Sequence, residues 1–220
     1  MTEIRVPVGD ASVSAVWERP DDAWAVIAVT HGAGAGYDHP FLVGFSDALN
    51  ADGVATLRFN LPYREAGRRM PGRPADAIAA WRDALRWAET ESAGLPVLAA
   101  GKSYGGRMAS MAVAEGMPAA ALVYLGYPLH PPGKPEALRD EHLYGIRVPM
   151  LFLQGTKDPF ATPELLDGVV GRIGASALLE WVEGGGHSFE VAGIKRTPAQ
   201  VGASLAPSVA AFVRGHASGS

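Results

Sequence analysis

The sequence contains, at residues 95–108, the stretch Leu95-Pro-Val-Leu-Ala-Ala-Gly101-Lys-Ser103-Tyr-Gly105-Gly-Arg-Met108. An apolar run typical of a buried strand leads into Gly-x-Ser-x-Gly, and a helical pattern follows it. A sharp turn from strand to helix folds the chain back on itself, so minimal side chains are needed on either side of the turn. Gly101 and Gly105 provide that space and leave the Ser103 hydroxyl exposed at the turn. A strand feeding directly into a helix indicates α/β architecture.

Similar apolar runs recur on both sides of this stretch. The expected strands are Ile4–Val8, Ser12–Trp17, Trp24–Thr30, Val54–Phe59, Pro96–Gly101, Ala121–Leu125, Pro149–Gln154 and Ala177–Val182. The first two alternate in polarity around Gly9-Asp10, which indicates an antiparallel hairpin. The later runs are almost continuously apolar, as expected for parallel strands covered on both faces by helices. We therefore expect a single α/β domain over residues 1–220, with a mostly parallel central sheet and an N-terminal antiparallel hairpin.

Helix signals stand between the apolar runs. The expected helices are Pro40–Ala51, a segment from Pro74, Gly105–Glu115, a segment from Thr162 and a segment from Thr197. Thr197 and Gln200 have the spacing of a capping box, and Gly116 occupies the position of a left-handed C-terminal cap. Pro207 is expected to kink or restart the last helix.

The composition excludes several classes of function. A hydrophobic content of 48% and a charged content of 19% are those of a globular protein, and the net charge of −4 does not favour a nucleic-acid partner. The absence of cysteine excludes disulfides, thiolate metal sites and a cysteine nucleophile. The N-terminus lacks a signal-peptide pattern, and no apolar run is long enough to span a membrane. A soluble cytoplasmic protein is the expectation.

Ser103 is the candidate nucleophile. A serine hydroxyl reacts when it is held beside a base, and backbone N–H groups at the following helix N-terminus stabilise developing negative charge. A rival interpretation treats Gly101-Lys102-Ser103 as the end of a phosphate-binding loop. That motif requires a glycine where this chain has Pro96, so nucleotide binding is disfavoured.

A second glycine-rich loop, His31–Gly36, follows the third expected strand. It lacks dinucleotide-binding spacing because residue 37 is Tyr37. Its position suits an oxyanion donor, which an α/β-hydrolase takes from this loop and from the residue after the nucleophile. We expect these donors to be the N–H groups of Ala33 and Tyr104, with Gly34 as an alternative to Ala33.

Asp158 and His187 are the candidate acid and base. Each follows an apolar strand directly, and their order after Ser103 is Ser, Asp, His, as this architecture requires. The carboxyl ends of parallel strands gather reactive groups at one edge of the sheet. The remaining histidines either precede the serine, lie in a proline-rich connection or stand near the C-terminus, and they fit the role less well.

Four arginines, Arg64, Arg68, Arg69 and Arg73, follow the fourth expected strand. They could receive an anionic substrate, but solvated or ion-paired arginines are the favoured interpretation. Trp81 and Trp87 lie at helical spacing and are expected to pack a helix against the sheet.

These motifs resemble the α/β-hydrolase superfamily from the Ala25–Gly36 strand and loop to Phe189. Thr30-His-Gly-Ala-Gly34, Asn60-Leu-Pro-Tyr63 and Gly101-Lys-Ser-Tyr-Gly-Gly-Arg107 look like the small, cap-less, dienelactone-hydrolase-like branch. That branch includes uncharacterised bacterial hydrolases and the hydrolase-like domain of a chromatin acetyltransferase-complex subunit. The resemblance implies a Ser–Asp–His hydrolase fold, while some relatives are regarded as scaffolds.

The sequence thus predicts a serine hydrolase that cleaves a small carboxylic ester through an acyl-enzyme on Ser103. The alternatives are a catalytically weak or inactive interaction module and an acyltransferase that uses the same triad. No metal or organic cofactor is expected, the partner is a small-molecule acyl substrate, and the oligomeric state stays open. Gly126–Val148, where many relatives insert a cap, is short and proline-rich, so no cap domain is expected, and only Glu136–Leu143 could form a short helix there.

Overall fold

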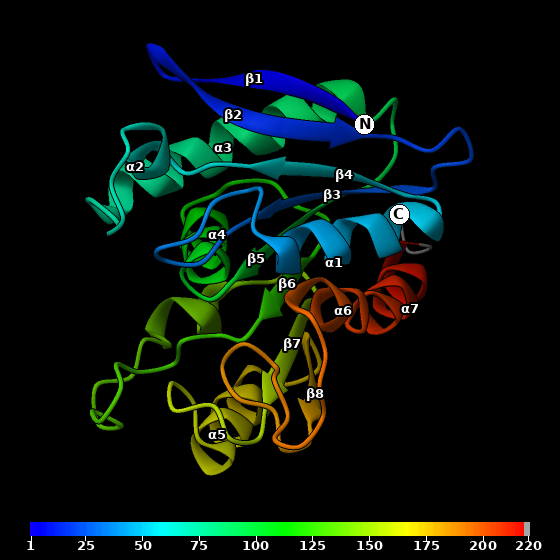
Figure 1. The fold of residues 1–220 in the computed structure, drawn as a ribbon. Helices are drawn as coiled ribbons and strands as arrows, with labels where there is room; N and C mark the ends of the chain where they lie inside the picture. Colours follow the sequence, from blue (N-terminus) through cyan, green and yellow to red (C-terminus); the bar gives the residue numbers. More distant parts are fainter. Residues whose placement is uncertain (218–220) are drawn as a thin grey trace.

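A computed structural model describes residues 1–217, and its centre is an eight-stranded sheet (Figure 1). The strands, given in their order across the sheet, are β1 (Thr2–Val8), β2 (Ala11–Glu18), β4 (Val54–Phe59), β3 (Ala25–Thr30), β5 (Val97–Lys102), β6 (Leu122–Leu125), β7 (Met150–Gly155) and β8 (Ala177–Val182). β1 and β2 form an antiparallel hairpin, and β2 is also antiparallel to β4. Every other pairing is parallel, so the carboxyl ends of β3 to β8 lie at one edge of the sheet.

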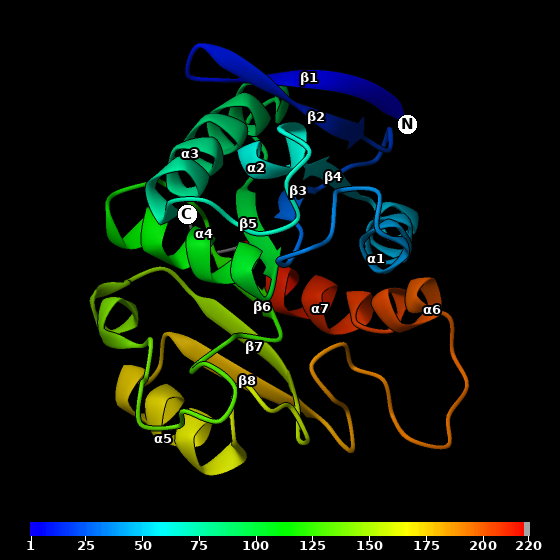
Figure 2. The same cartoon turned by 60° about the vertical axis from the view of Figure 1, so that its left-hand side comes forward.

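Helices cover both faces of this sheet, as Figures 1 and 2 show. One face packs against α3 (Pro74–Glu91), α4 (Tyr104–Ala114) and α5 (Pro163–Ile173), and the other against α1 (Pro40–Ala51), α6 (Pro198–Ala203) and α7 (Ala206–Ala217). Successive side chains of a strand point to opposite faces. In β3, for example, Val26 belongs to the first hydrophobic core and Ile27 to the second. Two cores on opposite faces account for the almost continuously apolar strand sequences.

The sequence predicted this architecture correctly. Each of the eight expected strands is present, with ends that differ by at most two residues. The Thr197 capping box is formed, with Thr197 N–H to Gln200 Oε1 at 2.9 Å and Gln200 N–H to Thr197 Oγ1 at 3.2 Å. The last helical region breaks after α6 and restarts at α7 with Pro207 as its second residue, where a missing backbone N–H costs no hydrogen bond.

Two short elements differ from the expectation. The turn α2 (Pro62–Glu65) was not predicted, although its proline at the first helical position is a start signal. The segment Glu136–Leu143, where a short helix was considered possible, contains only the beginning of a 3₁₀ turn, η1 (Glu141–Gly145). A hydrogen bond from Arg139 N–H to the oxygen of Leu129, 2.8 Å long, ties the preceding chain to another loop and prevents an earlier helix start.

Within residues 1–217 no cap domain covers the carboxyl edge of the sheet, because the connection between β6 and β7 consists of loops and η1. Trp81 is fully buried in α3, and its indole N–H donates to the oxygen of Gly105 at 2.9 Å. Trp87 packs edge-on against Trp17, with ring centroids 5.5 Å apart.

Among residues 1–217, no helix has both the length and the apolar character that crossing a bilayer requires.

The turn between β5 and α4 is a very close backbone contact at the carboxyl edge. A Cβ atom on Gly101 would lie 2.1 Å from the nitrogen of Gly106, and one on Gly105 would lie 2.6 Å from the oxygen of His31. Neither distance is compatible with a side chain. Ser103 stands between these glycines with φ of +50°, a left-handed conformation that is strained for a residue with a Cβ.

We therefore predict that Gly101→Ala destabilises the fold by about 1–3 kcal/mol, because the new methyl group forces backbone to move. Gly168→Ala is the matched control: Gly168 lies within α5 with open space around its Cβ position, so alanine there should stabilise the helix by up to about 1 kcal/mol. Thermal unfolding followed by circular dichroism measures both. Equal melting temperatures for wild type and Gly101→Ala would contradict the packing argument.

Candidate active site

Ser103, Asp158 and His187 meet at the carboxyl edge of the sheet, although 55 and 29 residues separate them in sequence. Ser103 follows β5, Asp158 follows β7, and His187 follows β8. His187 Nε2 lies 2.8 Å from Ser103 Oγ, and His187 Nδ1 lies 2.7 Å from Asp158 Oδ2. An ionised carboxylate only accepts hydrogen bonds, so Nδ1 carries the proton and Nε2 accepts from the serine hydroxyl. The three predicted residues thus form one continuous hydrogen-bonded chain.

The Asp158 carboxylate is held rigidly. Its side chain is fully buried, and it accepts from Gln154 Nε2 at 2.6 Å, from the backbone N–H of Phe160 at 2.8 Å and from His187. Hydrogen bonds to an ionised carboxylate are short and strong, and three of them fix the direction of its lone pairs. The group that orients the imidazole is therefore itself oriented by two neighbours.

The His187 imidazole is mostly buried, with 20% of its side chain exposed. Burial lowers its pKa below the usual 6.5, the hydrogen bond to Asp158 opposes that shift, and the Lys102 cation adds to it. The Phe160 ring packs on the imidazole with centroids 4.3 Å apart. At neutral pH the ring is consequently uncharged and able to accept a proton.

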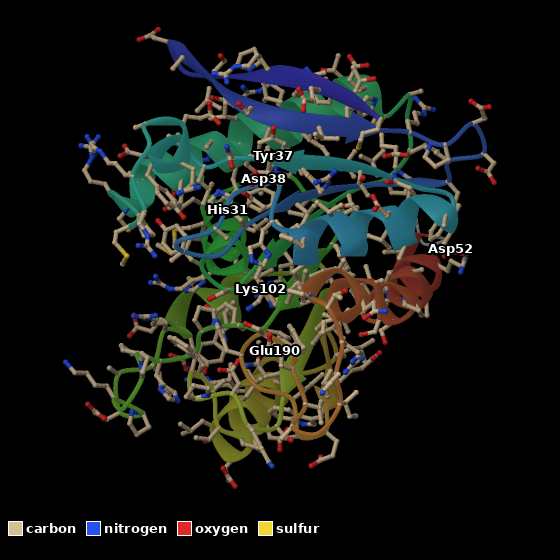
Figure 3. All side chains as sticks on the ribbon, viewed as in Figure 1. His31, Tyr37, Asp38, Asp52, Lys102 and Glu190 are labelled. Atoms are coloured by element: carbon tan, nitrogen blue, oxygen red, sulfur yellow. The ribbon has the colours of Figure 1, made fainter. Side chains whose placement is uncertain are left out.

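Lys102 also belongs to this site, although its place in the sequence indicated only the rejected phosphate loop. Its ammonium donates to the backbone oxygen of His187 at 2.8 Å and so ties the histidine loop to the end of β5. Burial lowers the pKa of Lys102 to about 8, and Asp158 partly offsets this effect. A lysine placed at the end of an apolar strand was the signal in the sequence. Figure 3 places Lys102 and His31 near the centre of the molecule.

The peptide between Gly32 and Ala33 is oriented by two side chains. The oxygen of Gly32 accepts from His31 Nδ1 at 2.8 Å and from Tyr63 Oη at 3.3 Å. In a trans peptide the N–H points opposite to the C=O, so the Ala33 N–H points away from Tyr63. Burial lowers the pKa of His31 to about 4, which keeps this imidazole neutral.

His31 also bridges two loops, because its Nε2 accepts from the backbone N–H of Leu61 at 3.1 Å. The Tyr104 N–H begins α4 directly after Ser103 and has no acceptor within its own helix. Ala33, Ser103 and Tyr104 all line the same cleft. Ala33 and Tyr104, predicted from the sequence, thus lie in this cleft, whereas the orienting contacts of His31 were not predicted.

The cleft has a volume of about 510 Å³. One part of its wall is apolar and contains Phe41, Leu42 and Phe160. None of the four arginines that follow β4 lines it: Arg73 forms an ion pair with Asp76 at 2.9 Å, and Arg64 donates to the oxygen of Arg68. Among residues 1–217, no group of three or more His, Asp or Glu side chains is placed to hold a metal ion.

Comparison with solved structures reveals the same fold in several hydrolases. Dienelactone hydrolase from Anabaena variabilis superposes with a TM-score of 0.79 at 21% identity, covering 98% of this chain and 97% of that one. A serine hydrolase without a lid from Xanthomonas campestris gives 0.75 at 15% identity, over 97% and 93% of the two chains. The esterase domain of a Rhodothermus marinus protein gives 0.74 at 16% identity, over 98% of each chain.

These matches agree with the cap-less, dienelactone-hydrolase-like resemblance that the sequence motifs indicated. At this level of identity they describe the fold alone. A family model described as an alpha/beta hydrolase domain matches residues 23–214, which include all the strands from β3 to β8 and the three hydrogen-bonded residues. The chain belongs to the α/β-hydrolase family.

Proposed function

We propose that this α/β-hydrolase cleaves small carboxylic esters through an acyl-enzyme on Ser103. The observation that carries the proposal is the unbroken hydrogen-bonded chain from Asp158 through His187 to Ser103. A serine becomes nucleophilic when a neutral imidazole takes its proton, and a buried carboxylate stabilises the imidazolium that results. The esterase and hydrolase structures that share this fold support the same reaction class.

In the first half of the reaction, Ser103 Oγ attacks the ester carbonyl carbon while its proton passes to His187 Nε2. The carbonyl oxygen becomes an oxyanion, and the N–H groups of Ala33 and Tyr104 stabilise it. One such preorganised donor contributes about 2.7–4 kcal/mol to the transition state. The tetrahedral adduct then collapses: the bond to the alcohol oxygen breaks, and His187 returns the proton to the departing alcohol.

In the second half, His187 removes a proton from water as the water oxygen attacks the acyl-enzyme. The same two N–H groups stabilise the second oxyanion. Collapse breaks the bond to Ser103 Oγ, which regains its proton from His187, and the carboxylic acid leaves. An acyltransferase would differ only in the acceptor that replaces water at this step.

The first test is labelling with a fluorophosphonate, which reacts with activated serines. We expect modification at Ser103 in the wild type and none in Ser103→Ala, whose kcat should fall by a factor on the order of 10⁶ if the triad is as efficient as that of a well-studied protease. Peptide mapping by mass spectrometry identifies the modified residue.

The matched control is Ser110→Ala. Ser110 lies in the same helix, with its Oγ 2.8 Å from His142 Nε2, but it is fully buried outside the cleft. This variant should label like the wild type. Absence of labelling at Ser103 in folded protein would favour the interaction-module alternative.

We predict that kcat/KM rises with pH and has its inflection below pH 6.5, because only neutral His187 accepts the serine proton and its pKa is lowered. Lys102→Met removes the neighbouring cation that lowers this pKa, so the inflection should move to higher pH. Rates measured from pH 4.5 to 8, with His187 titrated by NMR, test both expectations.

Lys195→Met is the matched control, since Lys195 is exposed to solvent, which screens its charge. Its pH profile should equal that of the wild type. An unchanged inflection in Lys102→Met would show that this lysine does not influence the imidazole.

The absence of a cap leads to a prediction about substrate size. A deep tunnel gains about 0.8 kcal/mol for each CH₂ it buries, whereas an open cleft stops gaining after a few. Across a series of p-nitrophenyl esters, kcat/KM should peak at short acyl chains and fall by the medium ones. The constant leaving group makes the series internally controlled, and a steady rise to long-chain esters would contradict the prediction.

A further inference from the structure

The loop that carries Ala33 is held at both ends by residues that follow β4. At the near end, the Leu61 N–H donates to His31 Nε2 at 3.1 Å. At the far end, the Tyr37 N–H donates to the side-chain oxygen of Asn60, Oδ1, at 2.9 Å. Figure 3 labels these two ends of the loop, His31 and Tyr37. Asn60 lies outside the lining of the cleft, so it can act on the reaction only through other residues.

Between its two ends the loop has little support of its own. Ala33 and Gly34 are exposed, and within residues 32–36 the described structure has one backbone hydrogen bond, from the Ala35 N–H to the oxygen of Gly32 at 3.3 Å. Gly34 has φ of +83°, in the left-handed region that disfavours a side chain. The position of the Ala33 N–H therefore depends on how the loop is anchored at its ends.

The Asn60 side chain is itself fixed by Glu65. Asn60 Nδ2 donates to Glu65 Oε1 at 2.8 Å. Burial raises the pKa of Glu65, but hydrogen bonds, above all the one from Asn60, outweigh this effect, so the pKa lies below its usual value. An ionised carboxylate only accepts hydrogen bonds, so the amide nitrogen faces Glu65 and the amide oxygen faces Tyr37. The two neighbours thus determine the orientation of the amide group.

The Glu65 carboxylate is anchored in turn to the N-terminal hairpin. Glu65 Oε2 accepts from Arg5 Nη1 of β1 at 2.8 Å and from Ser14 Oγ of β2 at 3.2 Å. The backbone N–H of Asn60 also donates to the oxygen of Ser14, at 2.9 Å. Asn60 consequently links the hairpin to the loop on which Ala33 lies.

The oxygen of Tyr37 is held as well. It accepts from Arg58 Nη1 at 3.0 Å, and the Arg58 side chain is buried in β4. Both polar backbone groups of Tyr37 are therefore bound by side chains from the end of β4. Loss of the Asn60 contact would leave the loop attached through Arg58 but with an unpaired N–H, so we expect such a variant to fold with a displaced loop.

We propose that Asn60 is a positioning residue for the oxyanion donor Ala33. The inference rests on the proposed function, because Ala33 acts in that reaction. Asn60 fixes the far end of the loop, while His31 fixes the peptide of Gly32 at the near end. With both ends fixed, the Ala33 N–H has its direction before the substrate binds, and the effect of such a donor on the rate depends on this preorganisation.

The first test is Asn60→Ala, which removes the acceptor of the Tyr37 N–H. We expect kcat to fall by about tenfold to a hundredfold and KM to change by no more than about threefold, because the oxyanion exists only after Ser103 has attacked. A trifluoromethyl ketone, which adds to the serine as a tetrahedral oxyanion, should lose affinity by a similar factor. Counting active sites with a fluorophosphonate corrects kcat for any unfolded protein.

An exchange of the two polar groups tests the hydrogen bond itself. Asn60→Asp keeps an acceptor for the Tyr37 N–H but places a second carboxylate against Glu65, so at pH 8 it should lose about tenfold or more in kcat. In Asn60→Asp/Glu65→Gln the amide and the carboxylate change places, and the same hydrogen bond forms in the reverse direction. This double variant should recover kcat to within about threefold of the wild type, a coupling expected for residues in direct contact.

Asn50→Ala is the matched control, because Asn50 binds the opposite end of β4. Its Nδ2 donates to the oxygen of Val54 at 2.9 Å, and its Oδ1 accepts from Thr56 Oγ1 at 3.2 Å. This variant should lower the melting temperature but leave kcat per active site and ketone affinity unchanged. An equal loss of kcat in both alanine variants, an unchanged kcat in Asn60→Ala, or no recovery in the double variant would overturn the inference.

Failure of the proposed function has a different outcome, namely no turnover at Ser103 in the wild type. The anchoring of the loop then decides the inference by itself. In ¹⁵N relaxation, the order parameters of the Ala33 and Gly34 amides should be about 0.85 in the wild type and fall toward about 0.6 in Asn60→Ala. They should keep the wild-type value in Asn50→Ala and return to it in the double variant. Equal order parameters in the wild type and Asn60→Ala would refute the positioning role.

Discussion

The close backbone contact at the end of β5 is the constraint on which the site depends. Because the chain reverses there without side chains on Gly101 and Gly105, α4 begins directly after Ser103. The same reversal brings the oxygen of Gly105 to the Trp81 indole, whose N–H donates a hydrogen bond to it. The buried Trp81 side chain of α3 thereby stabilises the turn. The strained backbone conformation of Ser103 persists because the close packing of Gly101 and Gly105 on either side prevents it from relaxing.

The chain order of the strands then brings the other two residues to the serine. β6 pairs with β5, β7 with β6 and β8 with β7, all in parallel, so the loops that carry Asp158 and His187 emerge at the same edge. These two loops are also bound to each other: the Lys157 N–H donates to the oxygen of Gly185 at 2.9 Å, and a Cβ on Gly155 would lie 2.1 Å from that oxygen. Gly155 and Gly185 thus allow the two loops to pack closely against each other.

Local patterns made most of the fold and three site residues predictable. Apolar runs, helix caps and the Gly-x-Ser-x-Gly turn depend on neighbours in the sequence, and so does the position of Asp158 or His187 directly after a strand. The contributions of Lys102 and His31 depend on partners 85 and 30 residues away, which no local pattern specifies. The four arginines after β4 illustrate the converse, because clustering in sequence did not bring them to the cleft.

An open site without a cap must select its substrate by other means than enclosure. The cleft has an apolar wall, but no cap closes over it among residues 1–217, so a long chain stays partly in water and hydrophobic contact gives limited discrimination between esters. Fixed charges act over a longer range and gain strength where the protein excludes water. The cleft wall carries cations, whereas the chain as a whole has a net negative charge. A cleft lined by one sign of charge focuses the electrostatic field and raises the local concentration of ions of opposite charge. Contacts with the polar and charged groups that line this cleft are therefore the remaining means of distinguishing one ester from another.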